Sequence, residues 1–320
     1  MSAPAAGGDA VIVRDVAKSF GETHALRGVS LAVAPGELFG FIGPDGAGKT
    51  TLFRILTTLM LPDAGSARVL GFDVERDLWA IRARVGYMPG RFSLYPDLTV
   101  EENLRFFAAV FGTTIAEGRA VIEPIWRQIA PFASRRADAL SGGMKQKLAL
   151  CCALVHRPDI LFLDEPTTGV DAVSRREFWE ILAELRAGGL TTLVSTPYMD
   201  EASQCDRVAL IHEGRILAIA PPDALGAGFG QALVAVRGAD RFALLKLLRE
   251  HSDTLAVYPF GAELHLTSRR PAAERDAAAR DVAAWLAARG HPDAVVAPIE
   301  PGIEDTFMAR MSGAAGEAAA

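Results

Sequence analysis

A glycine-rich segment at residues 43–50 has the spacing of a phosphate-binding loop. It reads GPDGAGKT, which satisfies G-x-x-x-x-G-K-[ST], and it lies between an apolar run, LFGFIG, and a run with helical spacing, TLFRILTTLM. Gly46 and Gly48 let backbone N–H groups approach phosphate oxygens at a helix N-terminus, whose dipole favours anions. Lys49 can supply positive charge to the β- and γ-phosphates of a nucleotide, and Thr50 a hydroxyl to Mg²⁺. This context disfavours the alternative of an ordinary glycine-rich turn.

The nucleotide contacts predicted for this loop are Gly43, Pro44, Asp45, Gly46, Ala47, Gly48, Lys49, Thr50 and Thr51. Asp45 is unusual among them, because a carboxylate beside bound phosphates is repulsive unless it points to solvent or meets a cation. The sequence leaves the role of Asp45 open.

Two adjacent carboxylates follow another apolar run. DILFLDEP places Asp164 at the carboxyl end of an expected strand, where ligands bind in open α/β sheets, and Glu165 follows directly. Asp164 can hold Mg²⁺, and Glu165 can orient and deprotonate an attacking water. Two exposed carboxylates without a function are the alternative, which the phosphate loop makes weaker. We therefore predict Lys49 and Glu165 as catalytic residues, and Thr50 and Asp164 as metal ligands.

Short apolar runs elsewhere indicate the sheet that must position these groups. VIVRDV, VSLAV and LFGFIG lie before the phosphate loop, and DILFLD, TTLVST and RVALIH follow it, separated by stretches long enough for helices. This pattern predicts an α/β fold with a mixed, largely parallel sheet. Between them, TVEENLRFFAAVF has helical spacing, with Thr99 placed as an N-cap and Glu102 three residues on.

The chain of 320 residues, half of them hydrophobic, has room for one large domain and a small one. We expect a flexible leader at residues 1–10 and a nucleotide-binding domain at residues 11–222, with a helical lobe at about residues 90–140. Alternating apolar and helical runs predict a small α+β domain at residues 230–312. The alanine-rich end at residues 313–320 lacks bulky apolar anchors and is expected to be a loose tail.

Composition excludes several classes of function. The net charge of −6 argues against a nucleic-acid partner, which a broad basic surface would bind. Cys151, Cys152 and Cys205 fit neither a disulfide framework nor a zinc spacing, and suit a reducing cytosol. The sequence contains no apolar run of about 18 residues that could span a bilayer. Any membrane role is therefore expected to come through a partner.

A third motif, LSGGMKQKLAL, makes a family visible. Together with the phosphate loop and the run DEPTTGVD, it resembles the ATP-binding cassette family over residues 11 to about 220. The resemblance implies a P-loop NTPase cassette that binds ATP and Mg²⁺ and pairs head to tail with a second cassette. Ser141, Gly142 and Gly143 would then close over the γ-phosphate held by the partner, although SGG alone is often only a flexible helix start. Asp171 matches the family's aspartate at the dimer seam.

Other segments refine the resemblance. Phe20 matches the aromatic residue that stacks on adenine, and its alternative is a core aromatic after a strand. RFSLYPDLTVEENL, YMDEA and EPGIEDTFMARM look like segments of the ATP-binding subunits of ABC-2 type exporters. This likeness implies an ATPase on the cytoplasmic face of the membrane, held there by integral permease subunits. The candidate permease contact is residues 91–104, with a plain loop and helix start as the alternative. The C-terminal domain would regulate or support the dimer.

Two residues depart from the family pattern. A glutamine is expected after YMP, where this chain has Gly90, and a histidine is expected after LVST, where it has Pro197. Proline has neither a side-chain donor nor a backbone N–H, so it cannot contact a γ-phosphate as imidazole does. The six histidines lie outside matching motifs and are interpreted as structural: His24, His156, His212, His251, His265 and His291.

Loss of these two polar contacts is predicted to lower the rate of ATP hydrolysis by on the order of a hundredfold or more. ATP affinity is expected to be affected less. In a heterodimer the defects would affect only the site at this chain's own phosphate loop, so we expect an intact second cassette and one slow site. A homodimer that hydrolyses with Glu165 alone is the rival. A nucleotide-gated interaction subunit without useful hydrolysis is a separate alternative. Cassette proteins of translation and DNA repair usually carry paired cassettes or long coiled coils, which this sequence lacks.

Overall fold

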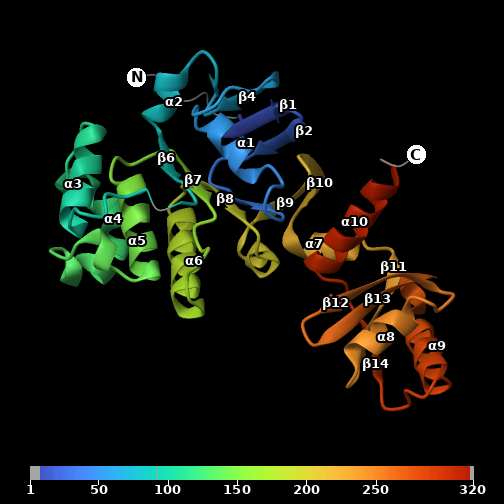
Figure 1. The fold of residues 1–320 in the computed structure, drawn as a ribbon. Coiled ribbons are helices and arrows are strands. Elements are labelled where there is room, and N and C mark those ends of the chain that lie inside the picture. Colours follow the sequence, from blue (N-terminus) through green and yellow to red (C-terminus); the bar gives the residue numbers. More distant parts are fainter. Residues whose placement is uncertain (1–7, 92, 318–320) are drawn as a thin grey trace. The chain divides into compact units, whose positions relative to one another are not determined.

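The computed structural model describes residues 8–91 and 93–317, and the chain divides into two units, Met1–Pro221 and Pro222–Ala320 (Figure 1). Residues 1–7 of the expected leader lie outside the described part. Ala10, at the end of that leader, is buried, and its N–H donates to the Val33 carbonyl at 2.7 Å. The packed part of the first unit therefore includes Ala10, the residue before its first strand.

A six-stranded sheet forms the centre of the first unit. Five strands are parallel, and one edge strand is antiparallel because it returns through a tight turn. Every residue of β3, β7 and β8, three of the four inner strands, is buried, and the sequences of β3 and β7 are accordingly almost entirely apolar. The prediction of a mixed, largely parallel α/β sheet is confirmed. In spatial order the strands are β10 (Arg215–Ala220), β9 (Arg207–His212), β3 (Leu38–Ile42), β8 (Thr191–Thr196), β7 (Ile160–Asp164) and β6 (Val85–Met88).

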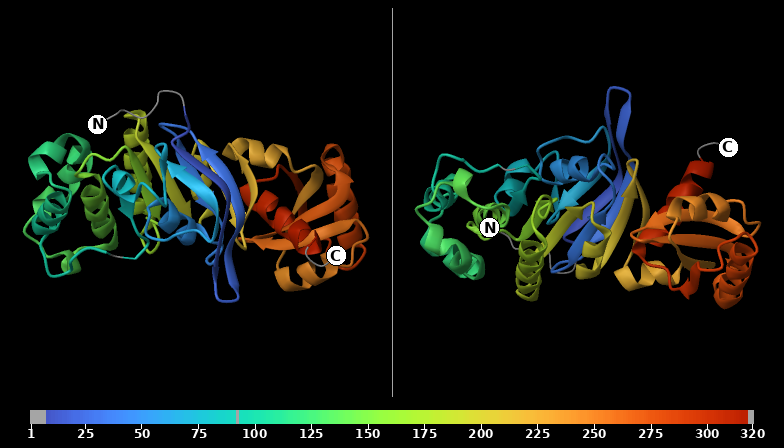
Figure 2. Two further views of the ribbon diagram at one scale, coloured as in Figure 1. Left: turned by 90° about the horizontal axis from the view of Figure 1, so that it is seen from above. Right: turned by 60° about the horizontal axis from the view of Figure 1, so that its bottom comes forward.

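A second, antiparallel sheet covers the helix that follows the phosphate loop. Its order is β2 (Thr23–Val33), β1 (Val11–Phe20), β4 (Ala64–Val69) and β5 (Phe72–Asp73), and Figure 2 shows the long β1–β2 hairpin extending from it. Helix α1 (Lys49–Leu56) packs into the shared core through Phe53, whose ring meets Phe41 at 5.5 Å and Phe162 at 5.6 Å between centroids. These edge-on aromatic contacts hold the middle of α1 against β3 and β7.

The helical lobe gathers on one side of the first unit (Figure 1). Helices α3 (Val100–Val110) and α4 (Ile115–Ile129) are followed by the short 3-10 helices η1 (Ala130–Phe132) and η2 (Ala137–Ala139). Helix α5 (Gly142–Leu154) packs against α3 and α4, so the lobe extends beyond residue 140. The remaining helices of this unit are α2 (Leu78–Arg82), α6 (Ala172–Ala187) and η3 (Met199–Gln204).

The predicted N-cap of the lobe is confirmed. The Thr99 hydroxyl accepts the Glu102 N–H at 3.2 Å, and the Glu102 carboxylate accepts the Thr99 N–H at 2.8 Å. This capping box satisfies two donors that the first turn of α3 would otherwise leave free.

Replacing Thr99 with Ala is expected to lower the free energy of unfolding by about 1 kcal/mol, because one N-cap hydrogen bond is lost. Urea unfolding followed by circular dichroism measures this change. Thr23→Ala is the matched control, since Thr23 is exposed and has no side-chain hydrogen bond within the described residues. Equal stability of the two variants would contradict the prediction.

The second unit is a βαββαβ domain. Its elements are β11 (Gln231–Arg237), α8 (Arg241–Leu248), β12 (Thr254–Phe260), β13 (Glu263–Pro271), η4 (Ala272–Glu274), α9 (Arg275–Ala287) and β14 (Val295–Ile299). The antiparallel sheet has the order β12-β13-β11-β14, which is the ferredoxin-like arrangement within the predicted α+β class. Both edge strands carry a proline, Pro259 and Pro298, which blunts pairing with a further strand.

Two helices complete the second unit. Helix α7 (Pro222–Ala227) lies almost entirely between the two predicted domains, which were expected to end at residue 222 and to begin at residue 230. Helix α10 (Ile303–Glu317) contacts α7, because Thr306 Oγ1 donates to the Leu225 carbonyl at 3.1 Å. The expected tail at residues 313–320 is too long, since α10 continues to Glu317. Alanine favours helix and needs no packing partner to do so. Across the described ranges, no helix is both long and apolar enough to cross a membrane.

Candidate functional site

The phosphate loop leaves β3 and enters α1 in a strained turn. Gly46 and Gly48 have φ of +78° and +106°, values that residues with a side chain rarely adopt. A Cβ at Gly48 would lie 2.4 Å from the Ala25 carbonyl oxygen, and one at Gly43 only 2.1 Å from that of Ile211. Gly48 is the N-cap of α1 and offers no side-chain cap, so the first N–H groups of α1 stay available to a ligand.

Lys49 folds back over this loop. Its side chain is only 3% exposed, and Nζ donates to the carbonyls of Gly43 at 2.7 Å and Pro44 at 3.0 Å. Nζ also lies 3.4 Å from Glu165 Oε1. A buried ammonium with these partners can exchange the carboxylate for a phosphate oxygen without leaving its place.

The expected metal ligands meet at the start of α1. Thr50 Oγ1 donates to Asp164 Oδ1 at 3.1 Å, and Asp164, the last residue of β7, is 2% exposed. A hydroxyl and a carboxylate, both oxygen ligands, suit a hard cation such as Mg²⁺. The residues present therefore fit the ion that the sequence predicts.

Two neighbouring cavities share Thr50 and Glu165. The first, of about 240 Å³, opens beside the phosphate loop, and the second, of about 420 Å³, lies toward β6. The first is lined by Phe20, Ala25, Gly46, Ala47, Gly48, Lys49, Thr50, Thr51 and Glu165. The second is lined by Thr50, Arg54, Tyr87, Pro89, Gly90, Arg91, Asp164 and Glu165.

Phe20 and Asp45 behave differently at this site. Phe20 is 49% exposed and lines the first cavity, so it is not the core aromatic of the alternative interpretation. Asp45, which the sequence placed among the nucleotide contacts, is exposed and lines neither cavity.

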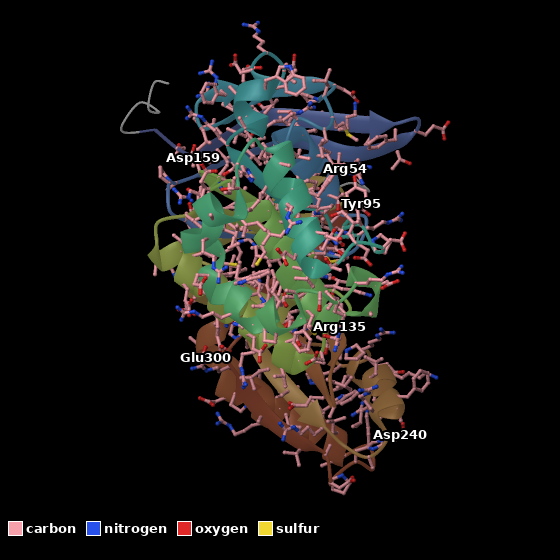
Figure 3. The ribbon with its side chains drawn as sticks, turned by 90° about the vertical axis from the view of Figure 1, so that its left-hand side faces the viewer. Arg54, Tyr95, Arg135, Asp159, Asp240 and Glu300 are labelled. Atoms are coloured by element: carbon pink, nitrogen blue, oxygen red, sulfur yellow. The ribbon has the colours of Figure 1, made fainter. Side chains whose placement is uncertain are left out.

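The second cavity is bounded by two arginines and a half-buried phenol. Burial, together with the charge of Asp164, raises the pKa of Tyr87 to about 12, so the phenol is protonated at neutral pH. Arg54 lies on α1, on the side of the first unit that Figure 3 shows, where Tyr95 before α3 is also labelled. The cavity wall therefore offers both positive charge and a neutral donor.

The structure does not bring the SGG motif or Asp171 to these cavities. Ser141 is the N-cap of α5, where its hydroxyl accepts the Met144 N–H at 3.3 Å. Asp171 is the N-cap of α6 and accepts the Ser174 N–H at 3.0 Å, a bond that lowers the pKa of its carboxyl. A Cβ at Gly143 would lie 2.4 Å from Ser174 Oγ, so the starts of α5 and α6 are packed closely. Ser141, Gly142 and Asp171 are exposed and line neither of the two phosphate-loop cavities.

One of the two departures, Gly90, borders the site, and the other, Pro197, lines neither cavity. Gly90 lines the second cavity, and a Cβ there would lie 3.0 Å from the Asp164 carbonyl oxygen. Pro197 directly follows β8, the strand beside β7. No histidine lines either cavity, as far as the described residues show. His156 instead stacks on Phe111, with centroids 3.7 Å apart, and His265 pairs with Asp305 at 2.7 Å.

A buried carboxylate that the sequence did not single out holds the segment after Pro197. Glu201 is 3% exposed and accepts the hydroxyls of Thr167 at 2.7 Å and Thr196 at 2.5 Å. Arg175 Nε of α6 lies 3.6 Å from the same carboxylate. The network joins the end of β8 to the loop before α6. Its sequence signal is the glutamate in YMDEA, but the sequence does not show that this residue is buried.

The three cysteines are buried and free. Burial raises the pKa of Cys205 to about 12 and that of Cys152 well above its usual value, so these thiols are protonated at neutral pH. None of the three thiols lines the phosphate-loop cavities, so they supply no nucleophile there.

Comparison with known proteins identifies relatives of the same architecture. The ABC transporter family model matches residues 26–168. The probable multidrug ABC transporter ATP-binding protein YbhF of Escherichia coli (strain K12) is 46% identical over 226 residues, which cover 69% of this chain and 39% of YbhF. This chain thus spans about two fifths of that relative.

Two further comparisons extend over more of the related chains. Nod factor export ATP-binding protein I of Paraburkholderia xenovorans (strain LB400) is 45% identical over 233 residues, covering 72% of this chain and 77% of that protein. A dimeric ATP-binding cassette, solved in a post-hydrolysis state with ADP and Pi, has a TM-score of 0.60 at 26% identity, covering 66% of this chain and 98% of that chain. With the phosphate loop, the acidic pair and the sheet already in place, these matches show that the chain belongs to the ATP-binding proteins of the ABC transporter family.

Proposed function

We propose that this chain binds and hydrolyses ATP to power an ABC-type membrane exporter. The observation that carries the proposal is the meeting of Lys49, Thr50, Asp164 and Glu165 at the start of α1, with Lys49 Nζ 3.4 Å from Glu165 Oε1 and Thr50 Oγ1 3.1 Å from Asp164 Oδ1. The loop N–H groups and Lys49 bind the phosphates, and Phe20 offers a face for the adenine ring. Glu165, at the junction of the two cavities, is placed to orient water and accept its proton.

Mg²⁺ held by Thr50 and Asp164 would offset the negative charge of the phosphates. The chain's own contribution is the buried position of Asp164, which keeps the carboxylate in one place before the nucleotide arrives. ATP must also separate Lys49 from Glu165, which frees the carboxylate at the moment of binding.

The proposal includes a slow site at this chain's own phosphate loop. Gly90 has no side chain to extend into the second cavity, and Pro197 has no donor where the family has histidine. Only Glu165 remains to act on water from this side. A nucleotide-gated subunit that does not hydrolyse ATP is the second candidate, and Gly90 and Pro197 are the residues that favour it.

Restoring the two polar groups is expected to raise ATP turnover by about tenfold or more in the double variant Gly90→Gln/Pro197→His, because single transition-state contacts contribute at least this much. Steady-state phosphate release measures it. The double variant Gly90→Ala/Pro197→Ala is the control, since it changes the backbone in the same way without adding a polar group. The new Gln Cβ needs the Asp164 carbonyl, 3.0 Å away, to move by a few tenths of an ångström. Pro197→His alone therefore provides a second test, and no gain in either variant would contradict a slow site.

We also propose that a second cassette completes the site. Ser141, Gly142 and Asp171 are exposed and start two helices whose N–H groups can approach a partner's nucleotide. In a heterodimer, this chain would lend the SGG loop to an intact partner site and receive the partner's loop at its own. Purifying the chain alone and with its partner cassette tests this, because equal turnover per subunit in both samples would contradict it.

The membrane partner is proposed to dock on an apolar groove of about 590 Å³ between the sheet side and the helical lobe. Trp79, 74% exposed, and Phe111 line it, and so do Ser93 and Leu94 from the predicted contact segment at residues 91–104. An apolar helix from a permease subunit fits such a groove, and would hold the chain at the cytoplasmic face. The transported substrate is a property of that partner, and the C-terminal domain is proposed to regulate or support the dimer.

A further inference from the structure

Ser195 connects the two carboxylates of the site. It lies on β8, is fully buried, and stands opposite Asp164 in the parallel pairing of β7 with β8. Its hydroxyl donates to Asp164 Oδ1 at 2.6 Å and accepts the N–H of Glu165 at 3.1 Å. One hydroxyl therefore uses its donor on the expected cation ligand and its acceptor on the residue expected to act on water.

Glu165 needs this support because its backbone is strained. Its φ of +50° lies in the left-handed region, which is unfavourable for a residue with a side chain. Its N–H is held twice by Ser195, by the carbonyl oxygen at 3.0 Å and by the hydroxyl at 3.1 Å. This conformation places the Glu165 carboxylate 3.4 Å from Lys49 Nζ, at the boundary of the two cavities.

Asp164 is oriented by the same hydroxyl. Its Oδ1 accepts from two donors, Thr50 Oγ1 at 3.1 Å and Ser195 Oγ at 2.6 Å. A buried carboxylate whose one oxygen is engaged from both sides cannot rotate freely, so its direction is set before a cation binds. Thr50 belongs to the phosphate loop and would contact the ion as well, which leaves Ser195 as the partner devoted to orientation.

We propose that Ser195 is a positioning residue that holds Asp164 for Mg²⁺ and Glu165 for water, without touching the nucleotide itself. This inference rests on the proposed ATP hydrolysis and extends it to a group on the neighbouring strand. If the Ser195 hydroxyl only formed hydrogen bonds that stabilise the buried core, removing it would change the stability of the fold and nothing else. A positioning hydroxyl affects the dependence on Mg²⁺ and the turnover, and leaves metal-free ATP binding nearly unchanged.

The matched pair Ser195→Ala and Thr192→Val tests the proposal in the full chain. Both remove a fully buried hydroxyl from β8, but the Thr192 hydroxyl has no hydrogen-bond partner in the described structure. Three quantities are measured for each variant: ATP affinity with EDTA, ATP affinity as a function of Mg²⁺ concentration, and kcat. Thermal unfolding with and without ATP reports folding.

Ser195→Ala is expected to raise the Mg²⁺ concentration for half-maximal ATP binding, and to lower kcat, each by about tenfold to a hundredfold. Its ATP affinity in EDTA is expected to stay within about twofold of wild type, and Thr192→Val is expected to match wild type in all three quantities. The inference would be overturned if Ser195→Ala and Thr192→Val had the same Mg²⁺ dependence and the same kcat. It would also be overturned if the ATP affinity of wild type did not depend on Mg²⁺ concentration. Absence of turnover in wild type would instead contradict the proposed function, while the Mg²⁺ titration would still decide the role of Ser195.

Discussion

Replacing Glu165 with Gln is expected to lower ATP turnover by about a hundredfold or more while ATP affinity stays within a few-fold of wild type. Glutamine keeps the shape of the side chain but cannot accept the proton of an attacking water, and a positioned general base contributes roughly a hundredfold to ten-thousandfold. Affinity is preserved because the phosphate contacts come from the loop N–H groups and Lys49. Removing the carboxylate also removes the group that pairs with Lys49 at 3.4 Å, so bound phosphate no longer competes with it.

Steady-state phosphate release and equilibrium ATP binding, measured on the same preparations, separate the two effects. Glu180→Gln is the control, because Glu180 is an exposed carboxylate of α6 that lines neither phosphate-loop cavity. A wild type no faster than Glu165→Gln would favour the non-hydrolysing interaction subunit. A large loss of affinity in Glu165→Gln would show that the carboxylate supports the loop rather than the reaction.

Replacing Gly48 with Ala is expected to weaken ATP binding by about a hundredfold. The added Cβ would lie 2.4 Å from the Ala25 carbonyl oxygen, and the φ of +106° is unfavourable for alanine. Relief of the clash moves the start of α1, and with it Lys49 and Thr50. A displacement of about 1 Å in a positioned site can cost a hundredfold.

Gly112→Ala separates the clash from backbone strain. Gly112 lies between α3 and α4 with a φ of +65°, and nothing lies within 4 Å of its added Cβ. Alanine at this position introduces the strain without a clash and lines neither phosphate-loop cavity, so the variant is expected to bind ATP as wild type does. Isothermal titration with ATP measures both variants. Equal affinity in Gly48→Ala and wild type would show that the loop tolerates a side chain where the structure leaves no room.

The parts of the fold with local physical causes followed from the sequence. Continuous apolar runs identified the buried strands β3 and β7, because a strand covered on both faces has no solvent-facing side. β8 is equally buried, although four of its six side chains carry a hydroxyl. The Thr99 capping box was predicted for the same kind of reason, since its two hydrogen bonds span only three residues. Two predicted boundaries differ from the structure: α10 extends into the expected tail, and the helical lobe includes α5.

Contacts between distant segments explain what the sequence could not show. Thr192, Ser195 and Thr196 all stand in the run TTLVST, yet their hydroxyls have different partners or none. Ser195 meets residues about thirty positions earlier only because β8 pairs with β7. Glu201 is likewise buried only because Thr167 and Arg175 surround it.

The sequence by itself determined the nucleotide chemistry, because the phosphate loop and the acidic pair are short motifs whose groups act through neighbouring backbone. It also predicted that the SGG motif serves another chain. Tertiary structure decided which groups share a cavity. Phe20 lines one cavity together with the phosphate loop, and Gly90 lines the other together with Asp164. It also decided that Ser195 holds both carboxylates. The physical reason is that hydrogen-bond geometry between strands depends on sheet order and register, which no local spacing specifies.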